Sequence, residues 1–385
     1  MGLMLLAFGV LFGLLGAVQY VIPGLWKQYL SFEKVRPLHV SSMIFWILSG
    51  AIGVVYGYVI QHVNRPIYSV RLQKVQLILF STTVTVVLLS YIAGVFGGRE
   101  FWEFDPVLAV PITASWVLFM INYVKTIGNF RNQPVYVWMW STGIFFFLFA
   151  YVESYLWLLP YFRNHVDQDI TIQWKSYGSM VGAWNMLIYG SGIYLMDKIS
   201  GSTVSSRSRM GFALYFLGLF NLMFNWGHHI YTLPTHEYVK HIGYAVSMSE
   251  LILLARIIYL WKSSFSTGMK YAHLVAYRFV MASDIWILLT LVLAIAMSIP
   301  AVNIYTHGTL ITVAHTMGAT IGIDTFLLMA CVADLFNDSR SPTETARRWV
   351  RRGLWIANSS LFVFWLSLIG AGILRSKWQM SAQQV

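Results

Sequence analysis

The first apolar run of the chain, residues 3–24, reads LMLLAFGVLFGLLGAVQYVIPG and contains no charged side chain. A helix needs about 20 apolar residues to cross the hydrocarbon core of a bilayer, so this run is long enough for one crossing. A secretory signal peptide is the alternative interpretation, because such peptides are also apolar and amino-terminal. The run is long for a signal peptide and has no basic residues before it, which favours an uncleaved first transmembrane helix.

Ten more apolar segments follow this run and are separated by short polar loops. They lie at roughly 39–62, 72–97, 106–126, 136–160, 171–196, 210–234, 239–262, 276–299, 305–336 and 353–374. Helices are favoured in lipid because they satisfy their own backbone hydrogen bonds. We therefore predict an all-α polytopic transmembrane bundle of about 11–12 helices, with a single domain over residues 1–385.

The composition of the chain agrees with a membrane protein. Its 385 residues are 57% hydrophobic and only 11% charged, against roughly 25% charged in a typical soluble domain. The formal net charge is +11, but the basic residues lie in the loops, where they set orientation rather than bind nucleic acid. Cys331 is the single cysteine, so a disulfide framework and a covalent c-type haem are both excluded.

The basic residues predict the orientation of the chain. Loops after the even-numbered segments are richer in Lys and Arg, and the loop at 299–305 has neither. The positive-inside rule therefore places the amino terminus and these loops in the cytoplasm. The first loop does not follow this pattern, and its charges are candidate partners for haem propionates. The even-numbered loops contain Arg65, Arg71, Lys74, Lys198, Arg207, Arg209, Lys262, Lys270, Arg278, Arg340, Arg347, Arg348, Arg351 and Arg352, and the first loop contains Lys27, Lys34 and Arg36.

Two adjacent histidines, His228 and His229, end the apolar segment at 210–234. Neighbouring side chains on an α-helix point about 100° apart, so both imidazoles can reach one metal only where the helix end is distorted. Gly227 and Pro234 permit such a distortion. The alternative is a hydrogen-bonded packing pair, but without a metal several ring nitrogens would need other partners. We therefore favour a site for Fe, Cu or Zn.

His315 and Met317 lie two residues apart in the segment at 305–336. This spacing puts them about 200° apart on an α-helix, so the helix can present one ligand to each of two haems. Histidine and methionine are both axial haem ligands, although a methionine in an apolar helix is more commonly a core residue. His39, near the start of its segment, is the candidate second ligand for the haem on Met317.

Several stretches resemble the haem-copper oxidase superfamily, and nitric oxide reductases in particular. Residues 36–42, RPLHVSS, resemble the superfamily's low-spin haem motif on helix two, and residues 227–229, GHH, its active-site metal motif. Residues 305–309, YTHGT, through Ala314 and His315 are similar to helix ten of nitric oxide reductases. Residues 98–100, GRE, resemble that family's calcium-binding segment. The resemblance covers nearly the whole chain.

The resemblance implies roles for these residues. His39 would bind a low-spin haem b, His315 a high-spin haem b, and His228 and His229 a non-haem iron or copper. The spacing to the histidine pair places Glu250 on the active-site glutamate, as ligand or proton donor. For Glu100 the resemblance implies a calcium site bridging haem propionates, with an ordinary exposed loop glutamate as the alternative.

The chain departs from the family pattern at two ligand positions. The family's second low-spin ligand is a histidine, where this chain has Met317. Its third metal histidine falls on Tyr177, which would be either a metal ligand or a hydrogen-bonding wall residue. Three further acids within the segments have two open interpretations, a proton path or hydrogen bonds between helices; they are Glu153, Asp284 and Asp324.

The function implied by the resemblance is the coupling of two NO molecules to N2O, with Glu250 and Tyr177 as catalytic residues. Electrons would come from a cytochrome c-bearing small subunit or from quinol, in a bacterial inner membrane. Three alternatives stay open: an O2-reducing terminal oxidase, an NO-disproportionating enzyme, and a non-catalytic haem subunit for electron transfer or gas sensing.

Overall fold

The computed structural model describes residues 1–246, 248, 273–339 and 343–382. Within these ranges, nine helical stretches are long and apolar enough to cross a membrane. A further long helix, α7 (Val166–Ser200), coincides with the predicted segment at 171–196. Ten of the eleven predicted segments are therefore helical. The remaining one, 239–262, is helical at residues 239–246 and 248, and its other residues, Glu250 among them, lie outside the described part of the chain.

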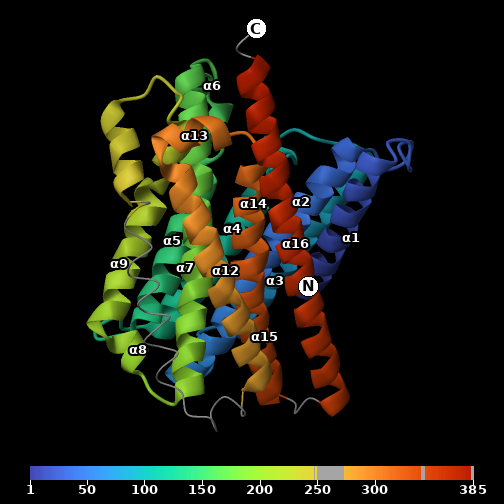
Figure 1. Cartoon of the computed structure of the whole chain (residues 1–385). Coiled ribbons are helices and arrows are strands. Elements are labelled where there is room, and N and C mark those ends of the chain that lie inside the picture. Colours follow the sequence, from blue (N-terminus) through green and yellow to red (C-terminus); the bar gives the residue numbers. More distant parts are fainter. Residues whose placement is uncertain (247, 249–272, 340–342, 383–385) are drawn as a thin grey trace. The chain divides into compact units, whose positions relative to one another are not determined.

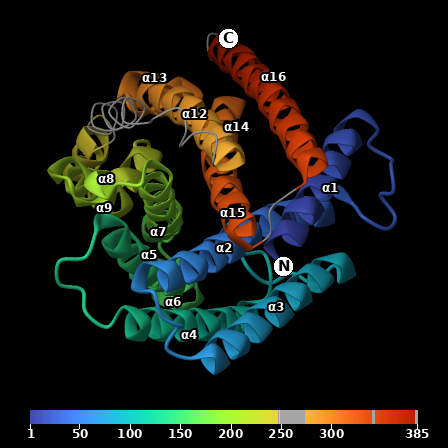
Figure 2. The same ribbon diagram turned by 90° about the horizontal axis from the view of Figure 1, so that it is seen from below.

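The described chain forms two compact units, Met1–Asn129 and Phe130–Val385. Helix α2 is the central helix of the first unit, and Figure 2 shows it between α1 and the α3–α4 pair. In its most apolar stretch 67% of the residues are buried, against 22% in α1. The helices of this unit are α1 (Gly2–Val21), α2 (Phe32–Val63), α3 (Val70–Ala93) and α4 (Ala109–Ile127).

Helix α2 begins at Phe32, seven residues before its predicted start. The polar residues of this first stretch interrupt the apolar run but remain helical, although Pro37 has no amide proton to donate to the preceding turn. His39 therefore lies two turns inside the helix rather than at its first residue. Helix α3 begins where the Ser69 hydroxyl accepts a hydrogen bond from the Leu72 amide, and it ends at Gly94 with a φ of 80°.

In the second unit, α7 packs against both α5 and α9 (Figure 1), and α12 packs against α15. An ion pair of 2.8 Å between Lys198 and the buried Asp334 joins α7 to α15. The longer elements of this unit, besides α7, are α5 (Val135–Glu153), α9 (Arg209–Phe224), α12 (Leu274–Ser298), α14 (Leu310–Met317), α15 (Phe326–Ser339) and α16 (Glu344–Ala382). The short ones are η1 (Pro106–Leu108, in the first unit), η2 (Leu156–Leu158), α6 (Pro160–Arg163), α8 (Val204–Arg207), η3 (Asn225–Ile230), α13 (Pro300–Thr306) and η4 (Gly318–Thr325).

Small residues let α7 and α9 approach closely. A Cβ atom at Gly182 would lie 2.8 Å from the Leu222 Cα, and one at Gly178 would lie 2.9 Å from the Trp226 Cβ. Both distances are too short for a real side chain, so only glycine allows this contact. The contact matters for the site, because Trp226 stands two residues before the histidine pair.

The predicted segment at 305–336 is helical but is interrupted near its start. Helix α13 ends at Thr306, Gly308 adopts a φ of 71°, and α14 begins after the Thr309 hydroxyl accepts from the Ile311 amide. The positive φ turns the chain, and the threonine cap starts a new helix. The chain then passes through the π-helical stretch η4 before it resumes α geometry at Phe326.

Candidate functional site

The histidine pair lies in η3, a 3₁₀ stretch that continues from the end of α9. The predicted distortion of this helix end is thus present. The ring centroids of His228 and His229 are 4.2 Å apart, and their planes are inclined by 44°. The side-chain amide oxygen Oδ1 of Asn225 lies 2.9 Å from Nδ1 of His228 and accepts its hydrogen bond, so the lone pair of the neutral ring is on Nε2. In this tautomer Nε2 can bind a metal.

Two residues that sequence reasoning missed lie beside this pair. The Trp174 indole, on α7, stacks on His229 with centroids 4.6 Å apart and planes inclined by 7°. It also approaches His307, whose ring centroid is 6.2 Å away. His307 belongs to the YTHGT stretch, so the sequence did contain a signal for it. Nothing in the sequence pattern distinguished Trp174 from the other 15 tryptophans.

Four imidazoles gather in this unit: His228, His229, His307 and His315, here called the histidine cluster. The two rings of η3 interact electrostatically with both His307 and His315. His315 lies on α14, and its Nδ1 is buried without a hydrogen-bond partner among the described residues. The tertiary structure therefore brings the predicted haem ligand His315 to the predicted metal ligands.

Met317 is the last residue of α14 and is half-buried. The α geometry between His315 and Met317 keeps them on different sides of the helix, as predicted. Its proposed partner His39 belongs to the other compact unit. Joint binding of one haem by Met317 and His39 therefore stays a prediction.

Tyr177 is 9% exposed and lies one turn after Trp174 on α7. Its neighbour Gly178 abuts Trp226 at the start of the histidine pair's 3₁₀ stretch. Among the residues that the structure describes, no three His, Cys, Asp or Glu side chains form a group able to hold a metal ion. Two histidines with Tyr177, and with Glu250 outside the described residues, therefore remain the predicted ligand set.

His39 is held by helix α1. Its Nδ1 lies 2.7 Å from the Gly9 carbonyl oxygen, which can only accept, so Nδ1 carries the proton and the lone pair is on Nε2. A Cβ atom at Gly13 would lie 2.7 Å from the same nitrogen, so this glycine makes room for the ring. A backbone carbonyl in this position is a common partner of metal-binding histidines.

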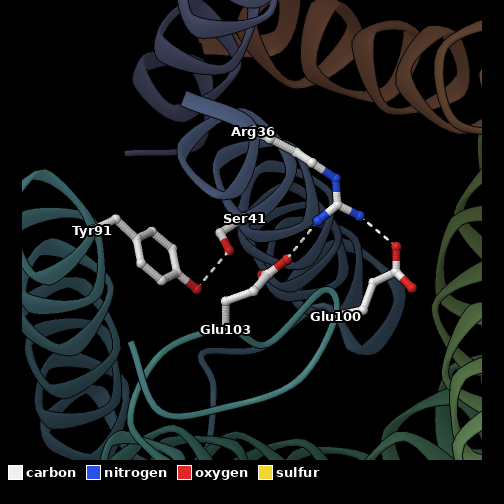
Figure 3. Close-up of polar contacts among 5 residues, drawn as sticks. All are labelled: Arg36, Ser41, Tyr91, Glu100 and Glu103. Atoms are coloured by element: carbon white, nitrogen blue, oxygen red, sulfur yellow. Dashed lines mark hydrogen bonds and ion pairs between the residues drawn. The ribbon is translucent and has the colours of Figure 1, made fainter. Parts of the chain in front are cut away.

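The segment predicted to bind calcium forms an ion-pair cluster with Arg36 (Figure 3). One guanidinium nitrogen pairs with Glu100 and the other lies 3.2 Å from Oε1 of Glu103. Beside them, the Ser41 and Tyr91 hydroxyls are 3.2 Å apart. Burial raises the pKa of the Glu103 carboxyl above its usual value, and backbone hydrogen bonds and Arg36 oppose this effect. Whether Glu100 also binds calcium stays a prediction.

Two of the acids within the predicted segments bond to other helices. Asp324, in η4, accepts a hydrogen bond of 3.1 Å from the Trp184 indole of α7. Glu153 of α5 pairs with Lys175 of α7. Both contacts agree with the helix-to-helix interpretation of these residues. Asp284 is buried in α12 at 7% exposure.

Residues 1–385 match the family model for polypeptide I of cytochrome c and quinol oxidases. The chain belongs to this family. It is 22% identical to a nitric oxide reductase subunit of Stutzerimonas stutzeri, over 95% of this chain and 80% of the relative. It is also 22% identical to a cytochrome c oxidase subunit 1 homolog of Agrobacterium tumefaciens (strain T37), over 98% and 70% respectively. For cytochrome c oxidase subunit 1 of Rhodobacter capsulatus the identity is 21%, over 94% and 69%.

Membership of the oxidase polypeptide I family makes the chain a multi-pass membrane oxidoreductase. The haems and second metal that this family implies fit the residues present. His39 and His228 each carry the ring lone pair on Nε2 because their Nδ1 protons are engaged. Within the described chain the buried Nδ1 of His315 has no hydrogen-bond partner, so this ring has a nitrogen available to a bound group. The donors are imidazoles, which suit haem iron, non-haem iron and copper.

Proposed function

We propose that the chain is a nitric oxide reductase, which converts two NO, two electrons and two protons into one N2O and one water. The observation that carries the proposal is the histidine cluster, where two adjacent imidazoles and His315 come together within one compact unit. The reductase relative, which covers 95% of this chain, supports NO as the substrate.

In this proposal the histidine cluster holds two metals close together. His315 binds the high-spin haem b, while His228 and His229 bind a non-haem iron or copper. When bound, these groups supply a Lewis acid and a template for the substrate. Asn225 keeps the proton on Nδ1 of His228, and the stacked Trp174 indole fixes the ring plane of His229. Both contacts orient ligands before the substrate arrives.

Proton supply is assigned to Glu250 and Tyr177. Glu250 acts as a metal ligand or as the proton donor. Tyr177, one turn from Trp174, acts as a further ligand or as a hydrogen-bonding wall of the site. Both assignments follow from the family pattern.

Electron supply is assigned to His39 and Met317, which would bind the low-spin haem b. A methionine ligand raises the reduction potential of a haem relative to two histidines. A cytochrome c-bearing subunit or quinol donates the electrons. The membrane is a bacterial inner membrane, with the amino terminus in the cytoplasm as the basic loops predict. Calcium at Glu100 would have to share this carboxylate with Arg36.

Oxygen reduction is the second candidate function. It is supported by two oxidase relatives at 22% and 21% identity, close to the value for the reductase relative. The superfamily's oxidases also use a tyrosine at the active site. Tyr177 is buried one turn after Trp174, which lies beside the histidine cluster. Turnover of the purified protein with NO and with O2 distinguishes the two functions.

The decisive experiment compares the wild type with His228→Ala and His229→Ala, and with His165→Ala as a control outside the cluster. We expect two haems and one non-haem metal in the wild type, and NO consumption with N2O as product. In either cluster variant the non-haem metal should be lost or bind more weakly by at least about 10–100-fold, the loss that follows when only a ligand's hydrogen-bond partner is removed, while both haems stay.

Other results would assign other functions. Turnover of O2 without NO would establish the oxidase, and formation of N2 and O2 from NO would establish disproportionation. A full haem content with no non-haem metal and no turnover would establish the electron-transfer or gas-sensing subunit. One haem per chain would contradict any two-centre reaction.

A further inference from the structure

Four arginines lie in the first turns of α16, and all four residues are exposed. At about 100° per residue they fall within about 140° of the helix circumference, so they share one face. Glu344 is the single acid in the sequence of this helix, and it pairs with Arg348 at 3.4 Å. The other three guanidiniums form no ion pair with the described residues. The four residues, called the arginine face below, are Arg347, Arg348, Arg351 and Arg352.

The length of α16 places the arginine face at the level of the lipid headgroups. The helix has 39 residues and is therefore about 58 Å long, at about 1.5 Å per residue. The hydrocarbon core of a bilayer is only about 30 Å thick, so α16 extends beyond it. Arg352 is followed two residues later by Leu354, the first buried residue of α16 and the start of its apolar part. The guanidiniums therefore stand where the phosphate groups of a bilayer lie.

The arginine face continues into an exposed apolar stripe along the membrane part of α16. The residues of this stripe follow Arg352 at intervals of three, four or seven residues, which keeps them on one side of a helix. Each is between 44% and 68% exposed. Each also directly follows a buried residue, so the stripe borders the side of α16 that packs against α12 and α14. The stripe consists of Trp355, Phe362, Leu366 and Ile373.

Cations beside an apolar stripe match the two parts of a phospholipid. Guanidinium groups donate paired hydrogen bonds to phosphate oxygens, and residues one helical turn apart have Cβ atoms about 5–6 Å apart. Two arginines of the face that are one turn apart can therefore bind one phosphate together. The Arg352 guanidinium carbon lies 5.4 Å from the Trp349 ring centroid. Contact through the flat face of a guanidinium leaves the N–H groups at its edge free to donate.

The charge of the arginine face decides the class of phospholipid. Because Glu344 pairs with one of the four arginines, three cations stay uncompensated within the described chain. A zwitterionic headgroup carries an ammonium group that these cations repel, whereas the phosphatidylglycerol headgroup carries only negative charge. Anionic lipids are the usual partners of such basic clusters directly beside a membrane helix.

We infer that the arginine face binds the phosphate of an anionic phospholipid, whose acyl chains lie along the apolar stripe of α16. The bound lipid holds the first turns of α16 at the membrane surface. The inference concerns lipid binding alone, so it holds or fails independently of NO reduction.

The test variant combines Arg351→Gln with Arg352→Gln, because these two cations lie nearest the apolar stripe. Both residues are exposed, and glutamine forms helices about as well as arginine, so the fold should be kept. The matched control combines Arg375→Gln with Lys377→Gln, which removes two exposed cations from the other end of the same helix. The control residues lie about 160° apart around the helix and therefore do not form a joint face.

The experiment uses the full chain in phosphatidylcholine nanodiscs that contain phosphatidylglycerol with a diazirine in its acyl chain. After illumination, mass spectrometry identifies the labelled peptides. We expect stronger labelling of residues 353–374 by this probe than by a phosphatidylcholine probe at the same mole fraction. The test variant should need about 30-fold more phosphatidylglycerol for half-maximal labelling, equivalent to about 1 kcal/mol for each cation removed. The control should behave as the wild type, and Glu344→Gln should need less phosphatidylglycerol.

Any of three results would refute the inference. These are equal labelling by the two lipid probes, undiminished labelling of a folded test variant, and loss of labelling when soluble glycerol phosphate is added at the concentration of the lipid. The third result would identify a site for free phosphate anions instead. NO consumption with an artificial electron donor is measured in the same nanodiscs. Its failure would count against the proposed reductase function and leave the lipid site standing.

Discussion

At the scale of single residues, the tautomer of a candidate histidine ligand depends on the partner of its Nδ1 atom. His39 donates its Nδ1 proton to the Gly9 carbonyl, and His228 donates its own to Asn225. In each case the hydrogen bond selects the tautomer whose Nε2 can bind a metal. His229 is positioned differently, by stacking against Trp174.

Asn225→Ala should therefore weaken the binding of the non-haem metal without changing either haem. Removing such a hydrogen-bond partner typically lowers metal affinity by about 10–100-fold. The measurement is the metal content of the purified protein after dialysis against graded concentrations of a chelator. Asn221→Ala, one turn earlier on α9, is the control. Equal metal retention in both variants would contradict the proposed role of Asn225.

Glu103 predicts a specific pH dependence of stability. Because burial raises the pKa of its carboxyl above the usual 4.5, the folded chain holds this proton more tightly than the unfolded chain. The contribution of Glu103 to the free energy of unfolding is thus most favourable below pH 4.5 and falls as the pH rises through the raised pKa. The Glu103→Gln variant lacks this titration. Its stability relative to the wild type should therefore increase as the pH rises from 4.5 through the raised pKa of Glu103. Thermal unfolding in detergent across this pH range measures the difference, and a relative gain by the wild type would refute the prediction.

At the scale of elements, the α7–α9 contact positions the histidine pair. Gly182 lies against Leu222, and one turn earlier Gly178 lies against Trp226. The chain between Leu222 and Trp226 leads directly into the 3₁₀ stretch that holds His228 and His229. The position of α9 along α7 therefore decides where the two imidazoles stand.

Gly182→Val should displace α9 and lower both stability and metal content. Overpacking of a close contact costs about 1–3 kcal/mol, and the shift would be transmitted to the histidine pair. Gly370→Val, in open space on α16, is the matched control and should leave both quantities unchanged. Thermal unfolding and metal analysis test the prediction, and normal metal content in Gly182→Val would contradict it.

The π-helical stretch η4 within the segment at 305–336 lies against α12, a contact that the apolar pattern does not reveal. A Cβ atom at Gly318 would lie 2.5 Å from the Thr290 hydroxyl, and one at Gly322 would lie 2.3 Å from the Trp286 ring. Helix α12 therefore packs directly against the backbone of the π-helical stretch η4. Such π stretches commonly occur at functional sites, and this one follows immediately after Met317.

At the scale of the whole molecule, the basic loops predict which end of each helix faces the cytoplasm. Helix α16 tests this best, because a dense group of arginines precedes its long apolar part. The group consists of Arg347, Arg348, Arg351 and Arg352.

In a Cys331→Ala background, a cysteine replacing Ala346 should react with an impermeant maleimide only from the cytoplasmic side. A cysteine replacing Gln379, near the other end of α16, should react only from the outer side. Labelling of right-side-out and inverted vesicles measures both reactions, and detergent-solubilised protein gives the maximum for each. The reverse pattern would contradict the predicted orientation of the whole bundle.

The sequence by itself determined that the chain is a helical membrane protein, since long apolar runs between charged loops have few other stable solutions. It also indicated His39, His228, His229 and His315, because histidines are costly in lipid and rarely retained without a partner. Tertiary structure decided what depends on contacts between distant segments. It placed Trp174 and His307 beside the histidine pair, and it engaged Glu100 with Arg36. Periodicity along one helix carries no information about which side chains of another helix will contact it. Those contacts are decided only when the helices pack together.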